Sequence, residues 1–88
     1  MNNTHNTLEP PFDYSRLRGR IVEKYGTIKE FSKRTRFSYN VASMKLNGKI
    51  TFSQDDMEEW CGLLDIDRID IGHYFFCPLG SKNTNSAG

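Results

Sequence analysis

Two short helical segments, separated by a very short turn, occupy residues 27–49 and constrain the fold more than any other feature of this sequence. Thr27 and Glu30 have the spacing of a capping box, in which the hydroxyl accepts a backbone N–H three residues on and the carboxylate bonds back. Ser38 is a favourable N-cap for the second segment, and Asn47-Gly48 ends it because both residues tolerate positive φ. The pattern therefore predicts two capped helices in close succession.

The turn between these helices, at Arg36-Phe37, leaves too little chain for them to lie antiparallel. Helices at residues 27–35 and 38–46 then cross at a steep angle, as they do in a helix-turn-helix. In that arrangement the second helix protrudes by its N-terminal end, with Ala42 and Leu46 pointing inward. A helix of this width fits the major groove of DNA, so we expect it to face a binding partner.

Three further helices are predicted around this motif. The first begins near Asp13 and ends at Gly26, and its inward face holds Tyr14, Leu17, Ile21 and Tyr25. The next is capped by Ser53, and its inward face holds Met57, Trp60, Cys61 and Leu64. A short last helix, capped by Asp67, holds Ile69 and Ile71 and is followed by Tyr74-Phe75-Phe76, which is either a docked tail or a short strand. The sequence predicts an all-α fold of five short helices without a substantial sheet.

The domain organisation follows from length and composition. A chain of 88 residues allows one small domain, which we place at residues 12–77. Residues 1–11 are polar and predicted to be a disordered tail, and residues 78–88 a flexible tail. The N-terminus lacks the pattern of a signal peptide and no apolar run is long enough to span a membrane, so we expect a cytoplasmic location without a membrane partner.

The sequence contains no motif typical of catalysis or of metal binding. Cys61 and Cys77 form no CxxC pair, and His5 and His73 add no ligand spacing, so we expect reduced thiols and neither a metal nor a cofactor. No nucleophile with a base, paired carboxylates or phosphate-binding loop is present, and a small helical domain has little room for a cleft. We therefore expect a chain that is not an enzyme and has no small-molecule substrate.

Charge is divided unevenly along the chain. Residues 12–50 hold ten Lys or Arg and three Asp or Glu, a net +7, whereas residues 51–76 hold one Arg and seven Asp or Glu, a net −6. A basic half suits a polyanion such as DNA. The acidic half is expected to face away from that anion or to face another protein.

The motif residues resemble the Cro-type phage repressor family of helix-turn-helix regulators. The likeness rests on Gly26-Thr27, Glu30-Phe31-Ser32, Phe37-Ser38, Leu46-Asn47-Gly48-Lys49 and Trp60-Cys61-Gly62-Leu63-Leu64-Asp65-Ile66. With Phe12-Asp13-Tyr14 and His73-Tyr74-Phe75-Phe76, the chain is similar to small regulators of temperate phages of Gram-positive bacteria. The resemblance implies a compact five-helix lambda-repressor-like domain in the bacterial cytoplasm that binds double-stranded operator DNA in the lysis/lysogeny switch.

The resemblance also implies which residues touch DNA. Base contacts would come from the outer side of the second motif helix, at Tyr39, Asn40, Ser43 and Met44. Phosphate contacts would come from hydroxyl and cationic side chains around it, at Thr27, Lys29, Arg34, Arg36, Ser38, Lys45, Lys49 and Thr51.

Three departures from the family pattern favour an alternative function. Ile28 replaces a phosphate-binding Gln, and Arg36 replaces a turn Gly, where a positive φ would cost on the order of 1 kcal/mol. The contact face carries Tyr39 and Met44 in place of longer polar residues.

The alternative is a modulator or antirepressor that binds the phage repressor protein and controls its DNA binding. Aromatic and Met side chains suit a protein interface, and the candidates for it are Ile28, Tyr39, Met44, Tyr74, Phe75 and Phe76. The aromatic end can cap the core of one chain or pack against a second copy in a homodimer, and both alternatives remain open, as does the operator sequence.

Overall fold

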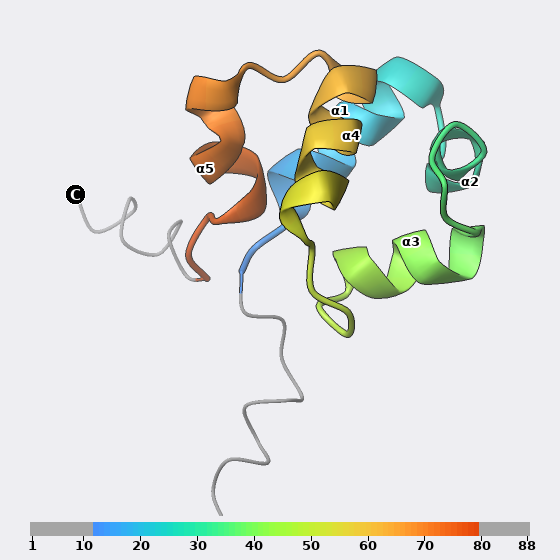
Figure 1. Ribbon diagram of the computed structural model, residues 1–88, viewed down its shortest axis with the longest axis horizontal. Coiled ribbons are helices and arrows are strands. Elements are labelled where there is room, and N and C mark those ends of the chain that lie inside the picture. The colour runs from blue at the N-terminus through green and yellow to red at the C-terminus, as the bar shows by residue number, and fades with distance from the viewer. Residues whose placement is uncertain (1–11, 80–88) are drawn as a thin grey trace, which may run out of the picture.

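The computed structural model describes residues 12–79, and the tails predicted at residues 1–11 and 80–88 lie outside the described part. Within it the chain is all-helical, as predicted (Figure 1). The helices are α1 (Ser15–Tyr25), α2 (Ile28–Ser32), α3 (Tyr39–Leu46), α4 (Gln54–Leu64) and α5 (Ile71–Phe75), and a 3₁₀ turn, η2 (Arg68–Asp70), leads into α5. Among the described residues β-pairing is limited to a single bridge between Phe12 and Pro78.

The core is built around Trp60 of α4. Its side chain is fully buried, and the rings of Phe31 and Phe52 pack edge-on against it with centroids 4.8 and 4.9 Å away. Leu17 and Ile21 of α1 are also fully buried. The prediction that Trp60 belongs to the core is confirmed.

Side-chain caps fix where three of the helices begin. Ser38 accepts the N–H of Val41 at the start of α3, and Ser53 and Asp56 form a complete capping box at the start of α4. Thr27 accepts the N–H of Glu30, so the hydroxyl half of the capping box predicted for α2 is present. The Glu30 carboxylate instead pairs with Lys33, 3.2 Å away.

The helix-turn-helix has a longer turn than predicted, because α2 ends at Ser32 rather than at Thr35. The Thr35 hydroxyl donates to the Ser32 carbonyl and accepts the N–H of Phe37, at 2.8 and 3.0 Å, so it organises the turn instead of extending the helix. Among the described non-Gly residues only Asp65 has a positive φ. Arg36 is therefore spared the strain expected for a residue in a Gly position.

The C-terminal part differs most from the prediction. The Asp67 side chain does not cap η2, and Ile69 lies in this 3₁₀ turn instead of in the last helix and is 86% exposed. Tyr74 and Phe75 belong to α5 and Phe75 is buried in the core, so this end docks on the core as a helix and is not a strand. The Asp13 N–H donates to the Cys77 carbonyl at 2.8 Å, which brings the two ends of the described chain together.

Three further features of the described residues concern membrane spans, metal sites and cysteines. None of the helices between residues 12 and 79 combines the length and apolar character needed to cross a membrane. Within the same residues no three His, Cys, Asp or Glu side chains gather where they could hold a metal ion. Cys61 and Cys77 are thiols, the first buried and the second half-buried.

Candidate functional site

The outer side of α3 presents the four side chains predicted to read bases. Tyr39 is 47% and Met44 37% exposed, Asn40 is exposed and Ser43 is partly exposed. Their spacing of three and four residues places them on one side of the helix. We name these four residues the α3 face; it is neutral, and its two largest members are an aromatic ring and a thioether.

The opposite side of α3 carries a buried charge. Lys45 is 4% exposed, and its ammonium donates to Asp56 Oδ2 at 2.7 Å and to the Thr51 carbonyl at 2.9 Å. The ammonium also lies 4.8 Å from the ring centroid of Phe37 and 5.7 Å from that of Phe52. Its predicted contact with a DNA phosphate does not fit this geometry, because the side chain points into the protein.

Arg36 is also turned toward α4. Its Nη2 lies 2.5 Å from Asp56 Oδ1, its Nε lies 3.6 Å from Glu59 Oε1, and its backbone N–H donates to Glu59 Oε2 at 3.0 Å. The guanidinium stacks over Phe37, 4.8 Å from the ring centroid. Since two carboxylates already neutralise Arg36, its predicted phosphate contact also fits poorly. We call Arg36, Lys45, Asp56 and Glu59 the Asp56 cluster.

Asp56 is ionised at the centre of this cluster. Burial alone would raise the pKa of its carboxyl, but hydrogen bonds from Lys45 and from the backbone and hydroxyl of Ser53, together with the Lys45 charge, lower that pKa below its usual value. Both carboxylate oxygens have cationic partners. The cluster therefore joins α3, the turn before it and the start of α4 through charged groups.

The other predicted phosphate-binding residues either cap a helix or remain exposed. The hydroxyls of Thr27 and Ser38 accept helix N–H groups as caps. The remaining four are exposed and lie on α2, on the turn and after α3: Lys29, Arg34, Lys49 and Thr51. Arg34 lies over the Tyr25 ring at 6.0 Å. Of the five predicted cations, Lys29, Arg34 and Lys49 are therefore exposed without an ion pair, whereas Arg36 is exposed but paired and Lys45 is buried.

The predicted interface residues outside the α3 face also differ in their exposure to solvent. Phe75 is 1% exposed and belongs to the core, so it cannot contact a partner without unfolding α5. Ile28 and Tyr74 are partly buried against that core. Phe76 is 46% exposed and is the member of this group most open to a partner.

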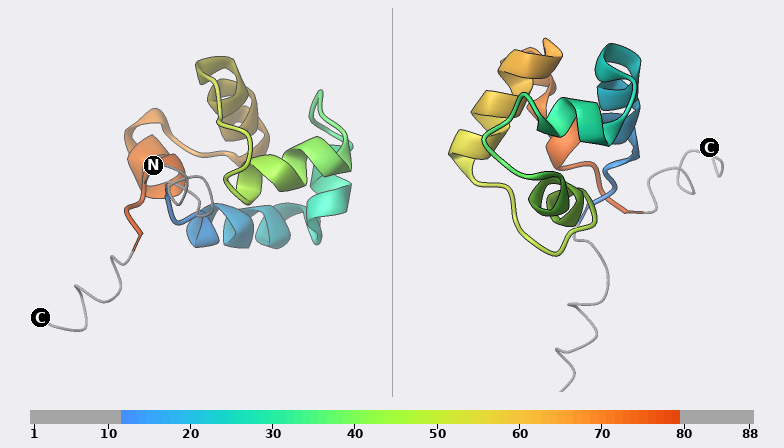
Figure 2. Two further views of the ribbon diagram at one scale, coloured as in Figure 1. Left: turned by 90° about the horizontal axis from the view of Figure 1, so that it is seen from below. Right: turned by 90° about the vertical axis from the view of Figure 1, so that its right-hand side faces the viewer.

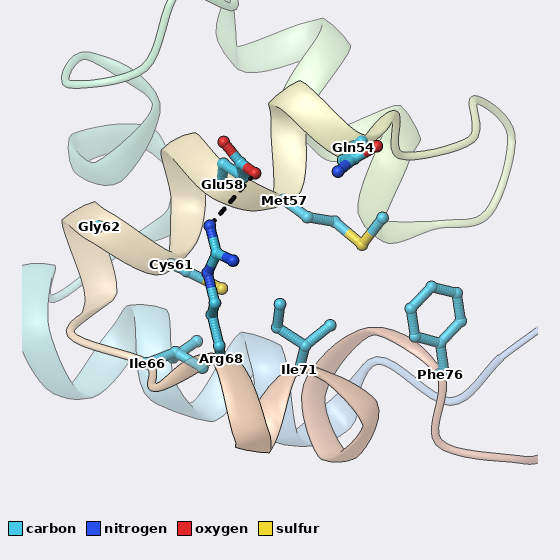
Figure 3. A pocket seen from close by; sticks show the side chains of 9 residues that line it. All are labelled: Gln54, Met57, Glu58, Cys61, Gly62, Ile66, Arg68, Ile71 and Phe76. Carbon is cyan, nitrogen blue, oxygen red and sulfur yellow. Dashed lines mark ion pairs between the residues drawn. The ribbon is translucent and has the colours of Figure 1, made fainter.

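Sequence reasoning missed a groove between α4 and the η2–α5 segment (Figure 3). Its volume is about 490 Å³, and it is lined by Gln54, Met57, Glu58, Cys61, Gly62, Ile66, Arg68, Ile71 and Phe76. Burial, the largest influence, raises the pKa of the Cys61 thiol, so this side chain is a neutral part of the lining. The available signal was the spacing of Gln54, Glu58 and Gly62 along one side of α4.

Five short helices, of which α2 and α3 are joined by a turn and the other three pack around them, define a class of small all-helical proteins with a helix-turn-helix arrangement. The chain belongs to the family described as "Protein of unknown function (DUF739)", which matches residues 11–77.

One solved structure similar to this chain is the solution structure of the modulator of repression (MOR) of the temperate bacteriophage TP901-1 from Lactococcus lactis. The two chains are 38% identical, and they superpose with a TM-score of 0.68 over 75% of this chain and 89% of the other. No curated protein matches this sequence.

Proposed function

We propose that this protein is a phage modulator of repression that binds a phage repressor protein through the α3 face and controls the repressor's binding to DNA. The observation that carries the proposal is the similarity to a modulator of repression, at 38% identity over 89% of that chain. The protein acts by binding and not by catalysis.

The chemistry of the α3 face supports a protein partner. Aromatic and Met side chains are enriched in the buried centres of protein interfaces, and Tyr39 and Met44 are both exposed on α3, with neutral polar neighbours. DNA binding draws most of its affinity from cations that neutralise phosphates. Lys45 of α3 is instead paired inside the protein, and Arg36, in the turn before α3, is half exposed but already paired with two carboxylates.

Operator DNA is the second candidate partner, and Asn40 is the observation that favours it. Its amide is exposed in the first turn of α3, from which an Asn side chain can make a bidentate contact with adenine when the helix enters the major groove. Lys29 and Lys49 are exposed and available for phosphates. A helix-turn-helix can use one face for either partner.

A paired titration separates the two candidates. Fluorescence anisotropy would measure the affinity of the wild-type chain for labelled operator DNA at low salt, and for the repressor encoded in the same genome. We expect micromolar or tighter binding to the repressor. Met44→Ala weakens that complex, while Asn40→Ala leaves it within about 0.5 kcal/mol.

On DNA the order of the two variants reverses. Asn40→Ala would cost about 1–3 kcal/mol of operator binding if the amide reads a base. An absence of repressor complex at micromolar concentration, together with operator binding that Asn40→Ala abolishes, would replace the first candidate with the second.

A further inference from the structure

The groove between α4 and η2–α5 is apolar on its floor and charged at its rim. Figure 3 shows the Met57 thioether and the Phe76 ring at one end, with Ile71 between them and Ile66. Arg68 extends across the groove toward Glu58, and the two charges lie 3.6 Å apart. This pair is mostly solvent-exposed, so an incoming cation can compete for Glu58 at little cost.

Gly62 is a second feature of this groove, beside its apolar floor and charged rim. It lies inside α4, where glycine weakens a helix relative to alanine, and a Cβ built on it would meet no atom within 4 Å. Packing within the chain therefore does not require glycine at this position. An exposed helical glycine on a groove lets the backbone of another helix approach closely, as small residues do wherever helices meet at short distance.

Charge determines which occupant suits the groove. Of the seven acidic side chains of residues 51–76, Asp56, Glu59 and Asp65 pair with cations of the basic half, and Glu58 pairs with Arg68. Asp55 and Asp67 adjoin the lining residues Gln54 and Arg68, and neither forms an ion pair with another residue of the described chain. A second copy of this surface would bring like charges together, whereas a cationic partner would be attracted.

We propose that this groove is a second contact for the repressor, and that it takes a cationic amphipathic helix of that protein. One apolar side chain of the helix enters between Met57 and Phe76, its backbone passes over Gly62, and Lys or Arg residues on its flanks meet Glu58, Asp55 and Asp67. The inference rests on the proposed function and adds a surface to it. Figures 1 and 2 show α5 and α3 on opposite sides of α4, and no residue of α3 lines the groove, so the two contacts are separate.

Two separate contacts make the complex bivalent. Once one contact has formed, the second becomes intramolecular, so it raises the overall affinity although the first contact itself is unchanged. Loss of either contact then weakens the complex but does not abolish it.

A glutamine scan at two glycines tests the groove in the full-length chain. Gly62→Gln places a neutral side chain across the groove, and Gly19→Gln is the matched control, since Gly19 is also a helical glycine with no atom within 4 Å of an added Cβ and lies on α1. Both replacements favour the helix, so we expect both to raise Tm by about 2–4 °C. Calorimetric titration with the repressor should then show Gly62→Gln binding at least tenfold more weakly and Gly19→Gln binding like wild type.

The salt dependence of the same titration tests the charge of the partner. Affinity of the wild-type chain should fall as salt rises from 50 to 300 mM, and Asp55→Asn with Asp67→Asn should flatten that dependence at least twofold. Repressor binding that is unchanged by Gly62→Gln overturns the groove contact and leaves the proposed function intact. Absence of any complex with the wild-type chain overturns both.

Discussion

The inner and outer sides of α3 use their residues in opposite ways. On the inner side Lys45 is buried, ion-paired with Asp56 and enclosed by the rings of Phe37 and Phe52. On the outer side Tyr39 and Met44 are exposed and carry no charge. The helix has thus directed its cation into the fold and left an uncharged surface to a partner, which is the reverse of what electrostatic DNA binding needs.

The same difference extends to the two halves of the chain. Lys24, Arg36 and Lys45 of the basic half form ion pairs with Asp65, Asp56 and Glu59 of the acidic half. The division of charge along the sequence is therefore larger than the division that a partner meets at the surface. Exposed charges without an ion pair in the described chain are a smaller basic set, Arg16, Lys29, Arg34 and Lys49, and the acidic residues Asp55 and Asp67.

The largest effect should follow from breaking the inner side at Asp56. Asp56→Ala leaves the Lys45 ammonium buried without a carboxylate and removes half of the capping box of α4. We expect a loss of about 3–5 kcal/mol in the free energy of unfolding, because an uncompensated buried charge is costly. Urea denaturation followed by Trp60 fluorescence measures it.

Two controls make this first prediction specific. Asp55→Ala, in the same helical turn but exposed and outside the cluster, should cost less than about 1 kcal/mol. Adding Lys45→Met to Asp56→Ala should recover part of the loss, since no buried charge then remains unpaired. If Asp55→Ala and Asp56→Ala cost the same, the cluster does not stabilise the fold in the way described.

On the outer side the largest effect should come from Tyr39. Tyr39→Ala removes the most exposed aromatic ring of the α3 face and should weaken the repressor complex by about 2 kcal/mol, or roughly 30-fold in Kd. The free energy of unfolding should change by less than about 0.5 kcal/mol, because an exposed side chain contributes little packing. An unaltered Kd in calorimetric titration would place the interface elsewhere.

Acid should weaken the inner side before it affects the outer one. The folded-state pKa of Asp56 is lowered, so its contribution to stability is complete above the unfolded value of about 3.9 and is lost as pH falls through the folded pKa. Each proton taken up on unfolding gives a slope of up to about 1.4 kcal/mol per pH unit below pH 4. Urea midpoints between pH 7 and pH 2 measure this slope.

Asp56→Asn is the matched variant for the acid titration, and its midpoint should fall less steeply. A residual slope is expected from Asp65, whose pKa is lowered by the hydrogen bond and charge of Lys24. Identical slopes for the variant and the wild type would contradict the assignment to Asp56.

The smallest effect should come from Lys33, which is ion-paired like Lys45 but exposed instead of buried. Lys33 pairs with Glu30 one turn earlier on α2, and both side chains are more than half exposed. Lys33→Gln should cost no more than about 0.5 kcal/mol, and less at high salt, because water already screens the pair. A loss comparable to that of Asp56→Ala in the same urea assay would mean that burial does not separate the two pairs.

Local features of this fold were readable from the sequence, because caps and breakers act over three or four residues. Ser38 and Ser53 cap α3 and α4 as predicted, and Gly26 and Gly48 adopt the positive φ expected where α1 and α3 end. The burial of Lys45 had a local signal too, since it follows Ala42 by three residues and precedes Leu46 on the inward stripe.

The parts that were not predicted depend on contacts between distant segments. Arg36 is neutralised by Asp56 and Glu59, which lie 20 and 23 residues away, and nothing in the turn itself identifies those partners. The groove exists because η2 and α5 pack against α4, and helical periodicity does not determine that packing. Ile69, predicted to belong to a short last helix, lies instead in a 3₁₀ turn and is exposed to solvent.

The enclosure of Lys45 has a consequence for how such a protein evolves. Because the stability of the motif rests on the inner side of α3, substitutions at Tyr39 and Met44 are nearly free of any folding penalty. Under the proposed function, a phage whose repressor changes can therefore acquire a matching modulator through a few surface replacements, while the Asp56 cluster beneath them stays constant. The same cluster opposes a return to electrostatic DNA binding, since swinging Lys45 outward would take from the buried Asp56 the cation that pairs with its Oδ2.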